Sequence, residues 1–168
     1  MTPRDESHAF SLDDIQWFAE NAKRQQVGPM RVLSMAEACA WYTEHWQKPP
    51  TVDDVLTVGV LVEPDAHNRM GGNFRTVDVW IGGDKGAPWR EVPRLVVALC
   101  EAGDSLAPDD WYREFERIHP FRDGNGRTGA ILWNGAKWRT QPVTKMFGWA
   151  HPPDFFDREW FKDERGKP

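Results

Sequence analysis

One short segment, His119–Arg127 with the sequence HPFRDGNGR, concentrates residues that are suited to chemistry. His119 can accept a proton near neutral pH, and Asp123 offers the hard carboxylate oxygens that Mg²⁺ shares with phosphate groups. The glycines on either side of Asn125 allow positive φ at low cost and so favour a tight turn. Amide groups of such a turn at a helix N-terminus can bind an anion such as a diphosphate, and Arg127 can fork onto a phosphate.

Each of these pieces is weak evidence when it stands alone. A single histidine more often serves as a structural hydrogen-bonding group, and a Gly-Asn-Gly sequence is usually only a turn. The segment also differs from a Walker loop, because it lacks GK[ST] and follows no predicted strand. The combination at this spacing nevertheless favours a phosphate-binding turn with a general base beside it.

Two predicted helices hold this segment between them. The stretch APDDWYREFERI has a proline near its first turn and places Trp111, Phe115 and Ile118 on one face, so a helix should end near Ile118 and His119 should leave it. A further helix is expected to begin around Gly126 and to run through Trp138.

Helical signals dominate the rest of the chain. Ser11 is expected to cap a helix, Ser34 and Glu37 form a capping-box pattern, and Thr51 follows two prolines as another cap. A fourth helical pattern runs through WREVPRLVVALCEAG. The expected fold is mainly α, with about five to seven helices packed around the helix that ends near Ile118.

The stretch NFRTVDVWIGG breaks the helical pattern. Val77, Val79 and Ile81 alternate with polar or larger residues between two pairs of glycines, which predicts a strand or hairpin from about Asn73 to Gly82. Its unpaired edge leaves two interpretations open. The hairpin is either a covering flap with no further role or an edge to which an extended segment of a partner adds as a strand.

Composition excludes several classes of function. The chain has 168 residues, enough for one domain, and its net charge of −5 argues against nucleic-acid binding. The longest apolar stretch, VLTVGVLV, is far shorter than the roughly 20 residues that cross a membrane, and the N-terminus has no signal-peptide pattern. We expect a cytoplasmic protein with no membrane partner. Cys39 and Cys100 are expected to be free thiols in helices, and the tryptophans are expected to serve mainly in packing.

At this point the sequence resembles a known family. HPFRDGNGR is similar to the signature of the Fic (Fic/Doc) domain, HPFx[D/E]GNGRxxR, and GGNFRTVDVWIGG looks like the flap of that family. The resemblance covers roughly residues 34–138. It implies a helical bundle with one β-hairpin flap over the active site. The expected organisation is an N-terminal helical segment (1–33), a Fic-like core (34–140) and an irregular C-terminal tail (141–168), within a single domain.

The resemblance implies transfer of a nucleoside monophosphate, usually AMP from ATP, to a Ser, Thr or Tyr hydroxyl exposed on a target protein. By position, His119 would be the general base, Asp123 would bind Mg²⁺ and Arg127 would contact the triphosphate tail. Phe121 would pack into the core and fix the loop. The phosphates would be held by Gly124, Asn125 and Gly126. Target docking would fall to the flap residues Phe74, Arg75, Thr76, Val77, Asp78 and Val79.

The chain departs from the family pattern at position 130, where alanine replaces the second arginine, which typically holds the γ-phosphate. This departure leaves three interpretations open: ATP binding with looser contacts to the tail, another substrate for phosphoryl or UMP transfer, or a degenerate domain that only binds peptide or nucleotide. The inhibitory pattern [S/T]xxxE[G/N] is also not matched, since QWFAEN has Gln16 at its first position. Without the arginine, an antitoxin-type inhibitor would lack its usual contact, and we expect the chain to be unrestrained in cis.

The same residues also suggest a third class of function. A metal-dependent hydrolase using His119 and Asp123 is less favoured, because no other histidine has ligand-like spacing to them. The remaining histidines are isolated and fit surface or core positions: His8, His45, His67 and His151.

Overall fold

The computed structural model describes residues 10–24, 27–65, 73–140 and 148–154. This part of the chain is mainly helical, with six α-helices and a two-stranded antiparallel sheet, as predicted. The α-helices are α1 (Leu12–Arg24), α2 (Met30–Thr43), α3 (Val52–Val62), α5 (Val92–Ala102), α6 (Pro108–Ile118) and α7 (Asn125–Thr140). Two short 3₁₀ turns, η1 (Trp89–Glu91) and η2 (Gly103–Ser105), flank α5.

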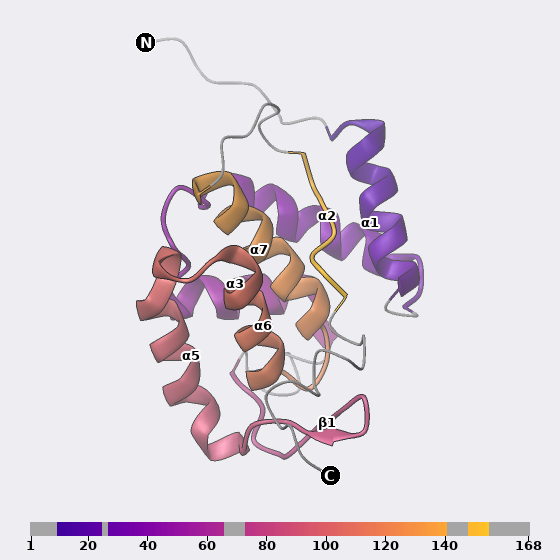
Figure 1. Cartoon of the computed structure of the whole chain (residues 1–168). Coiled ribbons are helices and arrows are strands. Elements are labelled where there is room, and N and C mark those ends of the chain that lie inside the picture. Colours follow the sequence, from indigo (N-terminus) through magenta and orange to yellow (C-terminus); the bar gives the residue numbers. More distant parts are fainter. Residues whose placement is uncertain (1–9, 25–26, 66–72, 141–147, 155–168) are drawn as a thin grey trace.

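Helix α7 is the centre of the bundle (Figure 1). It is buried along most of its length and packs against α6, α3 and α2, while α1 packs on α2 and α5 packs on α6. Gly129 allows the close approach of α6, because a Cβ there would lie 2.6 Å from Tyr112 Cε2. This close packing holds α6 and α7 together on either side of the turn that joins them.

The helix starts follow local hydrogen bonding. Thr51 caps α3 in a capping box with Asp54, and Ser11 and Asp14 bond in the same reciprocal way at the start of α1. The predicted capping box at Ser34 is wrong, because α2 already begins at Met30 and Ser34 lies inside it. The helix instead starts directly after Pro29, whose fixed φ suits a first turn and whose missing N–H needs no partner there.

The hairpin exists, but it lies later in the sequence than predicted. Strands β1 (Trp80–Ile81) and β2 (Asp84–Lys85) pair antiparallel. Gly82 and Gly83 have φ of 55° and 96°, so these two glycines form the tight turn of the hairpin and do not mark the end of a strand. Residues 74–79 lead into β1 without strand pairing of their own.

The described C-terminal segment, 148–154, is extended and lies along α7 and α1. The Asn134 side chain accepts from the Ala150 amide (2.8 Å) and donates to the Ala150 carbonyl (2.9 Å). Trp149 packs against Trp17 of α1 and Trp138 of α7, with ring centroids 5.2 and 4.9 Å apart. Of the tail expected at 141–168, only this segment lies within the described residues.

Cys39 and Cys100 are both free, as predicted, with Cys39 buried and Cys100 partly exposed. The boundary drawn between residues 33 and 34 falls within α2. None of the described helices has the length and apolar character needed to span a bilayer.

Candidate active site

His119 sits at the C-terminal end of α6 in a left-handed conformation, with φ 50° and ψ 64°. Its Nδ1 atom lies 3.3 Å from the Glu116 carbonyl oxygen and 3.7 Å from Glu116 Oε2. Since a carbonyl can only accept, this contact fixes the hydrogen on Nδ1 and leaves the lone pair on Nε2. Burial lowers the pKa of His119 to about 4, so the ring is neutral and able to accept a proton at neutral pH.

The turn after His119 is built from its own hydrogen bonds. The Asn125 side chain is buried and bonds both the amide and the carbonyl of Phe121 at 2.8 Å, while Phe121 itself lies in the core. Gly124 has φ 78° and donates to Asp123 Oδ1 at 2.6 Å. Helix α7 begins at Asn125, so the amides of its first turn have no carbonyl within the helix to bond. The positive end of α7 therefore opens where the turn reaches the surface.

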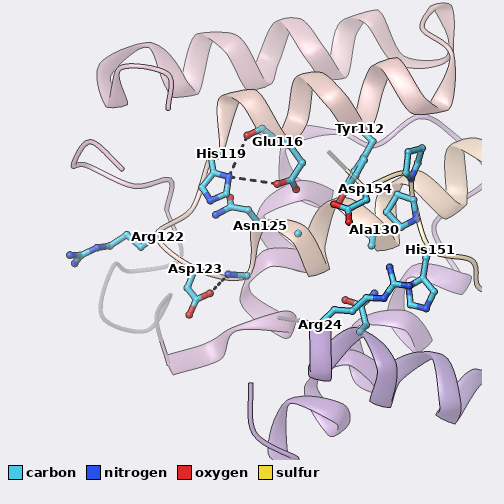
Figure 2. A pocket seen from close by; sticks show the side chains of 15 residues that line it. Arg24, Tyr112, Glu116, His119, Arg122, Asp123, Asn125, Ala130, His151 and Asp154 are labelled. Atoms are coloured by element: carbon cyan, nitrogen blue, oxygen red, sulfur yellow. Dashed lines mark hydrogen bonds and ion pairs between the residues drawn. The ribbon is translucent and has the colours of Figure 1, made fainter. Parts of the chain in front are cut away.

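A cavity of about 460 Å³ joins these groups to both ends of the described chain. Its volume lies within the range of sites for small molecules. Figure 2 shows His119 and Glu116 on one side and Arg24, Ala130 and His151 grouped on the other. The cavity is lined by Asn21, Arg24, Tyr112, Glu116, His119, Arg122, Asp123, Gly124, Asn125, Gly126, Ala130, His151, Pro152, Pro153 and Asp154.

Four of the predicted site residues therefore line the cavity together with His119: Asp123, Gly124, Asn125 and Gly126. Asn125 contributes mainly through its backbone, because its side chain is committed to Phe121. The sequence interpretation missed Glu116, Tyr112, Arg24 and the 151–154 segment. Glu116 and Tyr112 lie one and two turns before His119 on α6, so helical spacing could have found them; for Arg24 and the C-terminal segment the sequence carries no local signal.

Arg127 does not line the cavity. Its side chain is 1% exposed, and Nη2 lies 2.9 Å from Glu63 Oε2 and 3.4 Å from Asp123 Oδ1. Arg31 pairs with the same Glu63 carboxylate, so two arginines share one buried acid. Arg127 thus ties the end of α3 to the start of α7, and its guanidinium is held by protein groups.

Arg75, which was expected on the target-docking flap, is also buried. It donates to the carbonyl oxygens of His119 (2.7 Å), Val77 (2.8 Å), Ile118 (3.1 Å) and Ala87. Its amide also bonds the Pro120 carbonyl at 2.9 Å. These contacts pin both ends of the flap to the end of α6, so Arg75 holds the hairpin beside His119.

The other flap residues are less enclosed. Phe74 rests against Phe121, with centroids 5.8 Å apart. Asp78 pairs with Lys85 and accepts from the Trp89 amide. Val77 and Trp80 are exposed, which leaves apolar surface on the hairpin.

Position 130, where the motif arginine is missing, forms part of the cavity wall. Ala130 is 2% exposed, and α1 brings Arg24 and Asn21 to the same cavity. Next to Arg24 on α1, Glu20 bonds Gln16 (2.8 Å) and His151 (3.1 Å). A cation from α1 therefore stands at the cavity from which the motif arginine is absent.

A metal would have few protein ligands here. Within the described ranges, no group of three or more His, Cys, Asp or Glu side chains is arranged to hold an ion. The Asp123 carboxylate is 62% exposed at the cavity, with only Oδ1 bonded to protein. This suits Mg²⁺, which often binds through one or two carboxylates with phosphate oxygens and water.

Comparisons with known proteins agree with this geometry. A search of curated proteins finds no match. The Fic/DOC family matches residues 49–135, which run from the start of α3 through most of α7 and include the hairpin, His119 and the glycine turn. With half of its length matched, and with a helical bundle that carries a small hairpin beside the motif, the chain belongs to the Fic/DOC family.

Proposed function

We propose that this protein is a Fic-type transferase that moves a nucleoside monophosphate, AMP from ATP, onto a Ser, Thr or Tyr hydroxyl of a target protein. The observation that carries the proposal is the shared cavity, in which a neutral histidine stands beside the glycine turn and the N-terminal end of α7. Family membership supports a transferase at a coarser level.

The residues divide the reaction between them. The target hydroxyl gives its proton to His119 Nε2, and its oxygen attacks the α-phosphorus as the bond to pyrophosphate breaks. The amides at the start of α7 and the helix dipole stabilise the phosphate charge. Mg²⁺ at Asp123 would neutralise charge on the phosphates and the leaving group. Holding the hydroxyl and the α-phosphate in line beside His119 supplies much of the remaining rate enhancement.

The flap gives the target a place to bind. Arg75 fixes the hairpin against the end of α6, next to His119. The exposed Val77 and Trp80 offer apolar contact on the hairpin. An extended target segment laid along it would bring a hydroxyl towards His119 by strand addition.

A second candidate follows from Ala130. A cavity wall without the motif arginine favours a substrate with a different tail, for phosphoryl or UMP transfer, over an ATP held in the usual way. Arg24 lines the same cavity and could bind a tail from the other side. The two candidates differ in the group that is added to the target.

Incubation with Mg²⁺ and each nucleoside triphosphate in turn, followed by intact-mass analysis of the protein for self-modification, tests both candidates. Addition of AMP that disappears in His119→Ala supports the main proposal, and addition of UMP or of phosphate supports the second. The matched control is His45→Ala, since His45 is exposed and stacks on Trp41 away from the cavity. If the protein binds nucleotide or peptide equally with and without His119 and modifies nothing, it is a binding module.

A further inference from the structure

Glu116 is a buried acid inside the candidate active site, and no Lys or Arg side chain pairs with it among the described residues. Its side chain is 9% exposed, and Oε1 has no hydrogen-bond partner in the part of the chain that the structure describes. It also stands in the last turn of α6, where the negative end of the helix dipole disfavours a carboxylate. Burying such a group is costly, so local stability does not explain its presence.

The position of Glu116 points to His119. Oε2 lies 3.7 Å from His119 Nδ1, and the carbonyl of the same residue holds the Nδ1 hydrogen at 3.3 Å (Figure 2). The left-handed backbone at His119 bends the ring back over the helix end towards Glu116. When Nε2 takes a proton, the resulting positive charge is delocalised over the ring and lies beside this carboxyl group.

We propose that Glu116 is a positioning residue whose carboxylate stabilises the positive charge that His119 gains during the transfer; this inference rests on the function proposed above. In the step, the proton of the target hydroxyl moves to Nε2, the oxygen bonds to the α-phosphorus and pyrophosphate leaves. An opposite charge within about 4–6 Å favours a charged group by about 1–3 pKa units, so an ionised Glu116 accelerates formation of the imidazolium by roughly tenfold or more.

The effect depends on pH, because only the ionised carboxyl group stabilises the cation. Burial raises the pKa of Glu116 to about 8. The acceleration is therefore absent at pH 6 and appears as pH rises past about 8. Several titratable or charged groups face Glu116 and His119. Burial raises the pKa of one of them, Tyr112, well above 10. The others are Asp123, Asp154, Arg75, Arg24, Arg122 and His151.

The first measurement does not need the enzymatic reaction. Diethyl pyrocarbonate acylates the neutral imidazole, and peptide mass analysis gives the rate for each histidine at each pH. The His119 rate, normalised to that of His45 in the same sample, should rise several-fold between pH 6.5 and 9 in the natural protein. In Glu116→Gln it should stay flat, while Glu114→Gln, an exposed acid on the same helix paired with Arg117, should behave as the natural protein does.

The second measurement uses the self-modification assay. The rate ratio of the natural protein to Glu116→Gln should grow from near one at pH 6 to about tenfold at pH 9. Effects of pH on Mg²⁺ and nucleotide are common to both proteins and cancel in this ratio. Thermal unfolding of each variant checks that it is folded.

The outcomes separate the two proposals. A ratio and an acylation profile that do not change with pH would overturn the role of Glu116 and mean that it only fills space. If no nucleotide yields any modification, the proposed function fails, and the acylation profile still decides whether Glu116 acts on His119. If Glu116→Gln does not fold, Glu116→Asp takes its place in the test. This variant keeps a carboxyl group and should keep the pH-dependent rise in the acylation of His119. An acylation rate that does not change with pH in Glu116→Asp would count against the inference.

Discussion

Replacing Glu63 by glutamine tests whether Arg127 is held by the protein rather than by a nucleotide. Arg127 and Glu63 are 1% and 4% exposed, and 2.9 Å separates Nη2 from Oε2. Glutamine keeps the shape of the side chain but removes its charge, and so weakens the ion pairs of Glu63 with both Arg127 and Arg31. The Arg127 guanidinium would then keep the Val62 carbonyl at 3.3 Å and one charged partner, the Asp123 carboxylate at 3.4 Å, which is 62% exposed and binds more weakly because water screens it.

The expected loss follows from this burial. Breaking a buried ion pair by removing one partner costs about 3–5 kcal/mol. The remaining contact with Asp123, and the ability of glutamine to accept one hydrogen bond, place the value near the lower end. A free energy of unfolding about 3 kcal/mol lower corresponds to a Tm lower by roughly 6–12 °C for a chain of this size.

Urea unfolding followed by tryptophan fluorescence measures this loss as a lower midpoint with an unchanged slope. Asp65→Asn is the matched control, because Asp65 pairs with Arg31 at 3.0 Å while 73% exposed and should cost under about 1 kcal/mol. A Glu63→Gln protein no less stable than Asp65→Asn would refute the reasoning. Arg127 would then be free to contact a triphosphate, as the family resemblance implies.

Three further outcomes are expected. Ala130→Arg should tighten ATP binding relative to ADP by roughly ten- to a hundredfold, measured by calorimetry, if the site takes a triphosphate in the usual Fic pose; no gain for ATP over ADP favours another substrate. Arg24→Ala should weaken ATP binding by about tenfold, whereas Lys23→Ala, which lies outside the cavity lining, should not change it; equal effects would remove Arg24 from the site. Gly59→Ala would place a Cβ 2.6 Å from Phe121 Cζ and should cost about 1–3 kcal/mol in urea unfolding, and an unchanged midpoint would mean that the ring moves aside freely.

Local signals in the sequence were enough to predict most helices of the fold. Thr51 and Ser11 cap helices where their types and spacing suggest, because a cap depends only on neighbouring residues. Ser34 shows the limit of this approach, since a serine three residues before a glutamate also occurs inside a helix. The hairpin was misplaced for a similar reason, because two glycines can end a strand or turn it, and only pairing with β2 decides which.

The predicted site residues that share the cavity are close together in the sequence, whereas most other residues of its lining come from distant segments. His119, Asp123 and the glycine turn share the cavity, because one turn joins the helices that carry them. Arg127 and Arg75 have partners from distant segments, because Glu63 lies 64 positions from Arg127 and His119 lies 44 positions from Arg75 in the sequence. No local pattern predicts such a partner, so sequence reasoning did not find the hydrogen bonds that hold these two side chains in the fold.

A large part of the cavity lining comes from outside the matched motif. The family match covers 49–135, whereas Arg24, Asn21 and the 151–154 segment reach the same cavity from the two ends of the chain. Trp149 packs on both α1 and α7, and Asn134 fixes Ala150, so the contacts that hold the C-terminal segment also bring it next to α1. In the proposed function, the motif positions the α-phosphate, while these outer segments shape the space around the rest of the substrate. Ala130 lines this cavity from the motif, and Arg24 lines it from α1. The variants Ala130→Arg and Arg24→Ala therefore test the same region of the cavity from two sides.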